Sequence, residues 1–480
     1  MRVFTVAKLT AGLLVCAALV AAGAPAVAEH DQAATHVLNR LAYGPRAGDV
    51  AAVRAMGVAA WIERQLHPER ISDAALDGRL APLTTLTLDA ATIVRDYDRP
   101  AVQERRQRQR AKAEAPDAAT VPQSDAPATD APADDPRPAL SPAQRKNRTV
   151  LADLEDAKIL RAVYSERQLE AVLVDVWFNH FNVFAGKGPT RSYVTEYERD
   201  VIRPHVLGRF RELLGATAKS PAMLFYLDNW RNVARGLNEN YARELLELHT
   251  LGVDGGYTQQ DVVNVARAFT GWTMRARAGS GFRFAAALHD RAAKMVLGYA
   301  IGAGGGIEDG EQVLDLLAAH PRTAHLIATT LARRFVSDTP PSALVDRAAA
   351  RFLATRGDLR EVVRVIVTSP EFFAPAAAQS KLKTPFEFVV SALRAAGADV
   401  RNARPLARTL RELGMPLFFC QPPTGYDDTA EAWASAGALV SRVNFALALG
   451  ANGVRGSRLP SDAATRAAVE AIGSPAFRQR

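Results

Sequence analysis

Apolar side chains recur every three or four residues over 29–98 and again over 147–450, which is the spacing of amphipathic helices. Strand-like patterns are confined to GFRF near 281 and KMVLGYAI near 294, and these two runs could form one short hairpin. The sequence therefore predicts an all-α, mostly helical fold with at most one short β-hairpin, arranged as a large irregular helical bundle with a disordered insertion.

Several helix starts are marked by residues that can cap free backbone amides. Ser165–Gln168 and Thr384–Glu387 have the form of a capping box, in which a hydroxyl and a side chain three residues later each satisfy a backbone N–H group. Thr258 and Asp261 are placed to cap another helix in the same way. These repeated starts predict that the region after residue 146 is a series of separate helices and loops.

The first 28 residues are predicted to be a secretory signal that does not belong to the fold. Arg2 and Lys8 accompany an apolar run that ends in Ala-Val-Ala at 26–28, which is typical of a cleaved signal. No twin arginine is present, so we expect the general secretory route and a periplasmic or extracellular location. Cys16 lies inside the apolar run, where its neighbours fit a lipoprotein acceptor poorly.

Cleavage of that signal would leave Cys420 as the only cysteine, so no internal disulfide is expected. No other apolar run is long enough to span a bilayer, and the mature chain should therefore lack a transmembrane segment. The 59 Lys and Arg against 51 Asp and Glu give a net charge of +8. Because an exported protein rarely meets nucleic acid, the mild basicity favours contact with anionic surfaces or no specific partner.

Composition divides the rest of the chain into four parts. Residues 29–98 form an N-terminal helical subregion, and 147–450 form the main helical region. Between them, 99–146 contain ERRQRQRAK and then an Ala-, Pro- and Asp-rich run, which predicts a disordered linker because too little apolar surface is available for burial. The arginine cluster could bind an anionic partner, although a solvated tether is the favoured interpretation. Residues 451–480 are expected to be a loose C-terminal tail.

A polar row interrupts the otherwise apolar segment AVLVDVWFNHFNVF at 171–184. Asp175, Asn179 and Asn182 are four and three residues apart, which places them on one helical face, and His180 lies beside them. Buried polar groups need partners, so this row should face a hydrogen-bond network, a wet cavity or an ion. A structural network and a functional cavity are equally compatible with the pattern.

A second polar concentration lies in NENYARELLELHTLGVDGGYTQQDVVNVARAFTGWT, which contains Arg243, Glu244 and His249. The zinc-protease arrangement needs two histidines four residues apart on one helical face, and this stretch has one histidine. A buried ion-pair network is the favoured interpretation, with a catalytic site as the alternative.

A third candidate is His289-Asp290 with Lys294 close behind it. A His-Asp pair can supply metal ligands or a general base. Adjacent residues in an extended loop point in different directions, however, so this pair would need partners from elsewhere in the chain. The loop CQPPTGYDDTAEAW at 420–433 is rigid and aromatic, and it would serve equally as a cleft wall or as a structural crossing.

Eight ordered segments of the chain resemble a known bacterial family. Besides the stretch around His249, they include LNRLAYGPRAGD, WFNHFNVF, PAMLFYLDN, LHDRAAKMVLG, AAHPRTAHLIATTLARRFVSDTPP, KLKTPFEFVVSALRA and QPPTGYDD. The family is the one called Domain of Unknown Function 1800, and the resemblance spans residues 32–450 apart from the linker. It implies an exported, mostly α-helical protein, often encoded beside a second exported family that is similar to sulfatases and phosphatases. It implies no activity and no catalytic residues.

Two classes of function follow from these patterns. The favoured one is a cell-envelope binding or assembly protein that works with a second exported protein, and a sulfatase-like product of a nearby gene is the candidate partner. The alternative is an exported hydrolase that uses a bound divalent metal or an acid–base pair in a polar cavity. A hydrolase requires the three polar segments to converge on one concave site, whereas a binding protein requires an exposed apolar or charged patch. In the hydrolase, the catalytic groups or metal ligands would be Glu244, His249, His289 and Asp290. The cavity wall would be formed by Asp175, Asn179 and His180. An anionic group of the substrate would be held by Arg243 and Lys294.

Overall fold

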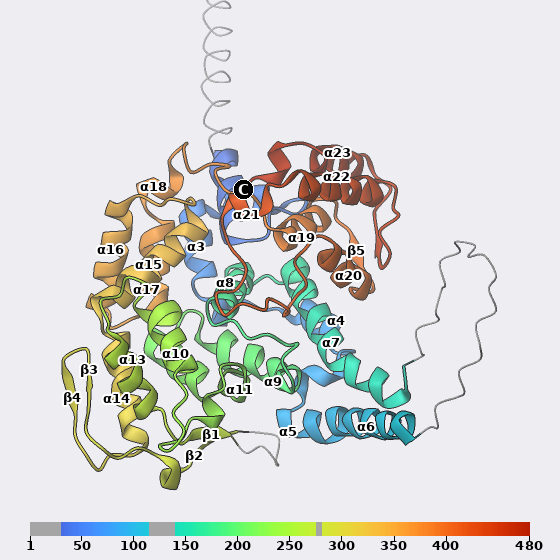
Figure 1. Ribbon diagram of the computed structural model, residues 1–480. Helices are drawn as coiled ribbons and strands as arrows, with labels where there is room; N and C mark the ends of the chain where they lie inside the picture. Colours follow the sequence, from blue (N-terminus) through green and yellow to red (C-terminus); the bar gives the residue numbers. More distant parts are fainter. Residues whose placement is uncertain (1–29, 115–139, 275–280) are drawn as a thin grey trace, which may run out of the picture.

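Helix α7 (Pro142–Tyr164) is the element on which the N-terminal and C-terminal parts of the chain meet (Figure 1). The helices that pack on it include α4 (Ala74–Leu80), α6 (Arg99–Glu114), α9 (Thr190–Glu196), α19 (Pro385–Ala395) and α20 (Arg404–Glu412). The computed structural model describes residues 30–114, 140–274 and 281–480. The predicted signal segment and the Ala-, Pro- and Asp-rich part of the predicted linker lie outside these residues. Helices fill both regions where apolar spacing predicted them, so the all-α prediction is confirmed.

The N-terminal half contains short helices and the long α7. After a first helix over 30–41, the helices are α2 (Asp49–Met56), α3 (Val58–Gln65), α4 (Ala74–Leu80), α5 (Ala90–Ile93), α6 (Arg99–Glu114), α7, α8 (Gln168–His180), α9 (Thr190–Glu196), α10 (Phe210–Lys219), α11 (Pro221–Tyr226) and α12 (Asn240–Glu244). Three single-turn π-helical segments interrupt or extend this series: η3 (Val94–Asp98), η4 (Tyr197–Ile202) and η7 (Leu245–Thr250).

In the C-terminal half, α15, α16 and α17 pack on one another. The apolar faces of all these helices meet in one continuous core, in which Trp177, Trp272 and Phe210 are fully buried. The helices are α13 (Gln259–Ala268), α14 (Ile307–Ala318), α15 (Pro321–Phe335), α16 (Ser342–Ala354), α17 (Leu359–Val367), α18 (Pro370–Phe373), α19 (Pro385–Ala395), α20 (Arg404–Glu412), α21 (Ala430–Trp433), α22 (Ala436–Gly450) and α23 (Ala463–Ile472).

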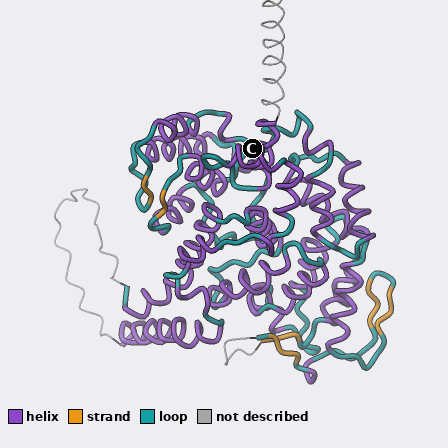
Figure 2. The backbone as a smooth tube through the Cα atoms, turned by 180° about the vertical axis from the view of Figure 1, so that it is seen from behind, coloured by secondary structure: helices purple, strands orange, loops and turns teal. Residues whose placement is uncertain are grey.

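The strands are short and lie at the periphery, in three antiparallel pairs among the described residues (Figure 2). We expected the two strand-like runs to form one hairpin, but each run takes part in a strand pair of its own. GFRF contributes β2 (Phe282–Phe284), which pairs with β1 (Trp272–Met274), and KMVLGYAI folds on itself as β3 (Lys294–Val296) and β4 (Tyr299–Ile301). Its two-residue turn is possible because Leu297 and Gly298 both adopt positive φ, of 49° and 80°. The third pair joins β5 (Asp399–Val400) to β6 (Ser457–Arg458).

Both ends of the predicted disordered linker are helical. Arg99–Glu114 forms α6, which packs on α7, and α7 itself begins at Pro142. Helix α6 is very polar, but the contact with α7 and the i,i+4 ion pair between Arg108 and Glu104 support it. The predicted linker residues 115–139 lie outside the described part of the chain.

The C-terminal residues also differ from the loose tail that we expected. Helix α23, capped by Asp462, packs on α22 and α19, and β6 pairs with β5. The last side chain, Arg480, is only 2% exposed, and its backbone N–H donates to the carbonyl of Lys381 over 2.8 Å. Composition gave no sign of this docking, because the contacts are made by a few side chains spread over a polar segment.

Two of the three predicted caps form as expected. Thr384 and Thr258 close capping boxes with Glu387 and Asp261 at the starts of α19 and α13. At Ser165 the structure differs, since this residue ends α7 and its hydroxyl donates to Asp73. None of the described helices is long and apolar enough to cross a bilayer, and Cys420, the cysteine of the described residues, is unpaired.

Candidate functional site

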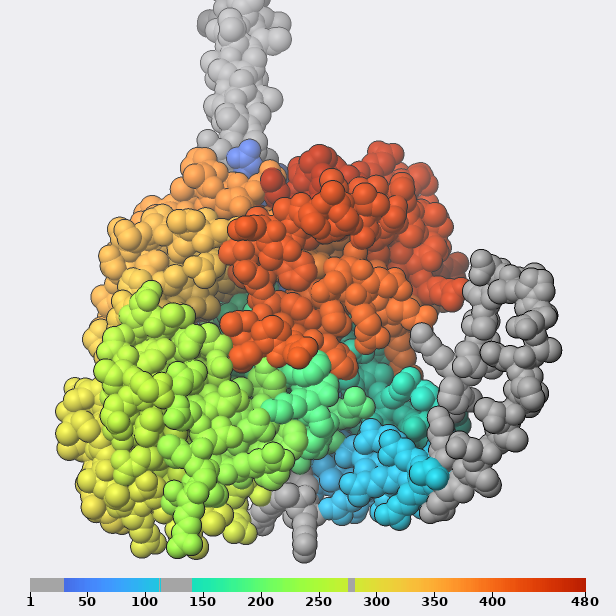
Figure 3. Space-filling view, viewed as in Figure 1, coloured from blue at the N-terminus to red at the C-terminus, as the bar shows by residue number. Residues whose placement is uncertain are grey.

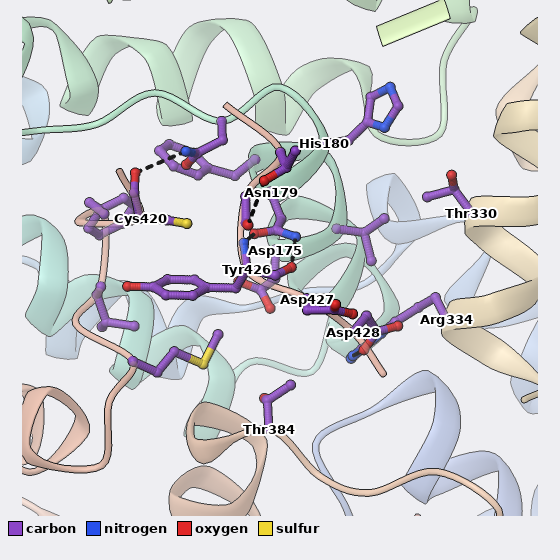
Figure 4. Close-up of a pocket in the computed structure, with 18 of the residues that line it drawn as sticks. Asp175, Asn179, His180, Thr330, Arg334, Thr384, Cys420, Tyr426, Asp427 and Asp428 are labelled. Carbon is purple, nitrogen blue, oxygen red and sulfur yellow. Dashed lines mark hydrogen bonds and ion pairs between the residues drawn. The ribbon is translucent and has the colours of Figure 1, made fainter. Parts of the chain in front are cut away.

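A cavity of about 330 Å³ lies between α8, the C-terminal part of α15, the start of α19 and the loop over 415–428 (Figure 4). In the space-filling view it opens as a hollow between the gold surface of α15 and the orange surface of the loop (Figure 3). Its wall is part polar and part apolar: Asp175, Asn179 and Thr330 contribute polar groups, and Met415, Leu417 and Phe418 contribute apolar ones. The cavity therefore combines segments that are far apart in the sequence.

Asn179 fixes the loop against α8. Its Nδ2 donates to the carbonyl of Tyr426 over 2.7 Å, and the N–H of Tyr426 donates to its Oδ1 over 2.7 Å (Figure 4). Gly425 makes this pairing possible, since it has φ of 74° and a Cβ there would lie 2.4 Å from the carbonyl oxygen of Asn179. The loop is thus held in one conformation before any ligand arrives.

The next residue of the polar row, Asn182, anchors the other end of the loop. Its Nδ2 donates to the carbonyls of Cys420 and Pro422, over 3.0 and 2.8 Å. Burial raises the pKa of the Cys420 thiol to about 11, so this cysteine stays a neutral thiol at neutral pH. The two asparagines of the predicted row therefore form a structural network, and they also line the cavity.

Asp175 completes the row through an ion pair with Lys158 of α7. The Lys158 ammonium also lies 5.1 Å from the ring centre of Phe386 and 5.3 Å from that of Phe418. A cation that is paired with a carboxylate and surrounded by ring faces is held in place by both kinds of contact. This pair forms a fixed polar patch on the α8 side of the cavity.

A buried ion network forms the opposite side. Arg334 lies 2.6 Å from Glu387 and 3.6 Å from Asp428, and Arg480 lies 3.1 Å from Glu387 and 3.3 Å from Asp428. Lys381 adds a contact of 3.2 Å to Asp428. Burial alone would raise the pKa of Glu387, but the two arginines lower it to about 2, so this carboxylate stays ionised. The network ties the docked C-terminal residues to the cavity.

Arg333 differs from the other cations of the cavity. It lies at the mouth and is exposed, and its Nε donates to the backbone carbonyl of Asp338 over 3.3 Å. No carboxylate among the described residues forms an ion pair with it, whereas Lys158 and Arg334 each have such a partner. Arg333 is thus the lining cation that is available to an anionic group from outside.

His180 lies at the edge of the cavity and turns its ring away from Asp175 and Asn179 (Figure 4). Its Nε2 donates to the carbonyl of His249, 3.1 Å away in the π-helical segment η7. Burial lowers the pKa of His180 to about 4, and burial together with His180 lowers the pKa of His249 to about 3. Both imidazoles are therefore neutral, and the Nε2 of His249 is buried without a hydrogen-bond partner.

The third predicted cluster forms a separate buried network. His289 Nε2 and Lys294 Nζ both contact Asp309 of α14, over 3.2 and 2.6 Å, and all three side chains are at most 2% exposed. Asp290 pairs with Arg267 of α13 at 2.8 Å, and this bond is the main reason that its pKa is lowered. These contacts fasten the segment before β3 to α13 and α14, and none of these residues lines the cavity.

Arg243 and Glu244 lie elsewhere again. Arg243 is paired with Glu239 at 3.0 Å, and burial followed by the neighbouring Glu247 raises the pKa of Glu244. Of the nine predicted site residues, the cavity gathers Asp175, Asn179 and His180 and leaves the other six outside. The convergence that a hydrolase built from all three segments requires is therefore not found. The described residues also contain no group of three or more His, Cys, Asp or Glu side chains placed to hold a metal ion.

The sequence did not single out the cations of α15. Arg333 and Arg334 lie in LARRF, which gives the ordinary signal of a charged helix end. The role of Arg334 depends on Glu387 and Asp428, which are 53 and 94 residues further along the chain. For this side of the cavity, the sequence gave one hint, the loop at 420–433. We expected this loop to be either a cleft wall or a structural crossing, and part of it does line the cavity.

Comparison with curated proteins and with solved structures finds no match to this chain. Comparison with protein-family models finds one whose description is "Protein of unknown function (DUF1800)", and it matches residues 36–480. This match covers the helices around the cavity, the loop over 415–428 and the docked C-terminal residues, so the earlier resemblance is confirmed and extends beyond residue 450. The chain belongs to the DUF1800 family of proteins of unknown function.

Proposed function

We propose that this chain is an exported binding or assembly protein that holds an acidic peptide segment of a second protein in the cavity between α8, α15 and the loop over 415–428. The observation that carries the proposal is Arg333, an exposed cation at the mouth with no carboxylate partner among the described residues. An arginine in this state recognises a carboxylate by charge-assisted hydrogen bonds.

The rest of the cavity supports a ligand with an apolar group beside its acid. Met415, Leu417 and Phe418 form an apolar wall, and mixed linings of this kind are typical of small binding pockets. The hydrogen bonds from Asn179 and Asn182 fix the loop in advance, which lowers the entropy lost on binding. The sulfatase-like exported protein implied by the family resemblance is one candidate source of the peptide segment.

The chemistry of the lining favours binding over hydrolysis. A nucleophilic mechanism needs a hydroxyl or thiol with a base within hydrogen-bond distance. The Cys420 thiol has a pKa of about 11, and His180 uses its Nε2 proton to bond a backbone carbonyl. The Thr330 hydroxyl donates to the carbonyl of Leu326, and the Thr384 hydroxyl caps α19. None of these described side chains is paired with a general base.

The test uses two peptides, acetyl-Glu-Leu-amide and acetyl-Gln-Leu-amide, in calorimetric titrations of the mature protein. We expect the acidic peptide to bind about tenfold more tightly than its neutral analogue, and Arg333→Gln to remove that difference. Thr330→Phe should abolish binding of both peptides by filling the cavity. Thr329→Phe is the matched control, since this neighbouring threonine of α15 does not line the cavity. Equal binding of the two peptides, or binding that survives Thr330→Phe, would exclude the proposal.

A further inference from the structure

A second hollow surface lies away from the first cavity, along the N-terminal part of α7. A cavity of about 480 Å³ is bounded by α6, α7 and the loop before α9, and a cavity of about 370 Å³ is bounded by α7, α9 and α20. Asn147, Arg148 and Arg191 line both, so the two cavities adjoin and form one groove. We call this the α7 groove, and its helices are seen at the lower right of Figure 1.

Four arginines line the α7 groove: Arg105 from α6, Arg148 from α7, Arg191 from α9 and Arg411 from α20. No carboxylate among the described residues forms an ion pair with the first three of these, although Arg191 lies 3.5 Å from the amide oxygen of Asn147. Four separate helices thus contribute an arginine to one groove. Among the described residues, only Arg411 of these four forms an ion pair.

Two carboxyl groups of the groove, Asp98 and Glu155, offset part of this charge. Burial raises the pKa of Asp98 and raises that of Glu155 to about 7, so Glu155 is part protonated at neutral pH. Glu155 is the partner of Arg411, at 3.7 Å, and Asp98 accepts a hydrogen bond from Asn147. Four arginines line the groove against two carboxyl groups, so its lining carries an excess of positive charge.

The groove contains almost no aromatic surface. Phe419 is the one aromatic side chain among its lining residues, and the guanidinium of Arg411 lies 5.8 Å from the centre of its ring. Proteins that bind single-stranded nucleic acid stack the bases on aromatic side chains, and this groove offers no series of such platforms. Its chemistry suits the charged groups of a chain that carries no bases.

We propose that the α7 groove binds a linear chain of phosphate groups, with Arg105, Arg148 and Arg191 in contact with successive phosphates. Guanidinium groups match phosphate oxygens in geometry and charge, and arginines from different helices can follow a chain that lies along the groove. This surface is separate from the peptide cavity, and the proposal holds whether or not that cavity binds a peptide.

The experiment measures binding of a fluorescently labelled inorganic polyphosphate of defined length to the mature protein by polarisation, over a series of salt concentrations. We expect Arg105→Gln/Arg148→Gln to weaken binding by about a hundredfold, or about tenfold for each arginine. The slope of log affinity against log salt should fall by about 0.7 for each arginine removed. The matched control is Arg106→Gln/Arg110→Gln, which makes the same charge change on exposed residues of α6 that do not line the groove.

Equal loss in both double variants would overturn the proposal, because it would show attraction to net charge alone. Tighter binding to single-stranded DNA, to a sulfated polysaccharide or to anionic vesicles of equal charge would overturn it as well. Hydrogen exchange on the unmutated protein provides a test that does not depend on the variants folding. Polyphosphate should slow exchange of the backbone amides at 186–191 and 98–105, and no change there would exclude the groove as the site.

Discussion

The segment that contains α8 and the segment at 240–294 both place polar side chains among apolar ones, but the structure uses these polar side chains differently in the two segments. On α8, Asp175 and Asn179 bond to other parts of the chain and in doing so frame a cavity. In the later segment, His289 and Lys294 both contact Asp309 in a buried network that does not line the cavity. A polar residue in an apolar helix thus predicts a partner, but it does not predict whether space for a ligand remains beside that partner.

The largest effect should come from breaking the buried network at Asp309. Asp309→Ala leaves Lys294 and His289 buried without their carboxylate, and we expect it to lower the free energy of unfolding by about 3–5 kcal/mol. Urea denaturation monitored by circular dichroism measures this loss. Asp290→Asn is the control, because the Asp290–Arg267 pair is partly exposed and should be worth about 1 kcal/mol or less. Similar losses in both variants would contradict the difference in burial between the two ion pairs.

Acidification tests the histidine pair that joins the two segments. The pKa values of about 3 for His249 and about 4 for His180 lie below the ordinary value of 6.5. Because the unfolded chain takes up these protons first, both histidines favour the folded state less as the pH falls from 6.5 toward their folded values, and their contribution is constant above that range. When the pH is lowered from 7.5 to 4, the free energy of unfolding of His249→Phe should therefore fall by about 3 kcal/mol less than that of the unmutated protein.

Other groups act in the opposite direction over part of this range. Burial raises the pKa of Glu155 to about 7 and that of Asp156 to about 6, so protonation of these carboxyls favours the folded state. Urea denaturation measures the free energy of unfolding of the unmutated protein and of His249→Phe at both pH values. Both proteins contain these carboxyl groups, so their contributions cancel when the two pH-dependent changes are subtracted. Parallel pH profiles for the two proteins would show that the imidazole of His249 is not held neutral.

An intermediate effect is expected where α8 meets the loop. Gly425→Ala places a Cβ 2.4 Å from the carbonyl oxygen of Asn179 at φ of 74°, and we expect it to cost about 2 kcal/mol of stability. Hydrogen exchange should also speed up at 420–428 while α8 stays protected. Gly437→Ala in α22 is the matched control, since its added Cβ meets open space and alanine favours a helix. Unchanged exchange in Gly425→Ala would mean that this contact does not hold the loop.

The sequence predicted the helical regions and four residues of the cavity because these depend on local patterns. Apolar spacing determines where helices form, and Asp175, Asn179, His180 and Asn182 were visible as polar residues in an apolar segment. The other half of the site depends on long-range contacts: Asn179 meets Tyr426 across 247 residues, and Arg480 meets Arg334 across 146. Nothing in a single sequence shows which distant residues will meet.

The hairpin error has a different cause. The turn of β3 and β4 requires positive φ at Leu297, a conformation that a leucine seldom adopts and that is therefore a poor expectation from residue type. The side chain of Asp261 supports it by accepting a hydrogen bond from the Leu297 N–H over 2.8 Å. A contact from the cap of another helix thus selects the local conformation.

The smallest effect on stability should separate Arg243 from Arg333, two arginines whose roles the sequence could not rank. Arg243→Gln removes a predicted substrate-binding residue, but its ion pair with Glu239 is partly exposed and lies outside the cavity, so stability should change by less than about 0.5 kcal/mol and peptide binding should not change. Arg333→Gln should be as stable as Arg243→Gln, because Arg333 has no carboxylate partner among the described residues to lose. Only the second variant should lose the preference for acetyl-Glu-Leu-amide in calorimetric titration. If Arg243→Gln lost that preference instead, the binding site would belong to the segment at 240–294, and the contrast between the two polar segments would be reversed.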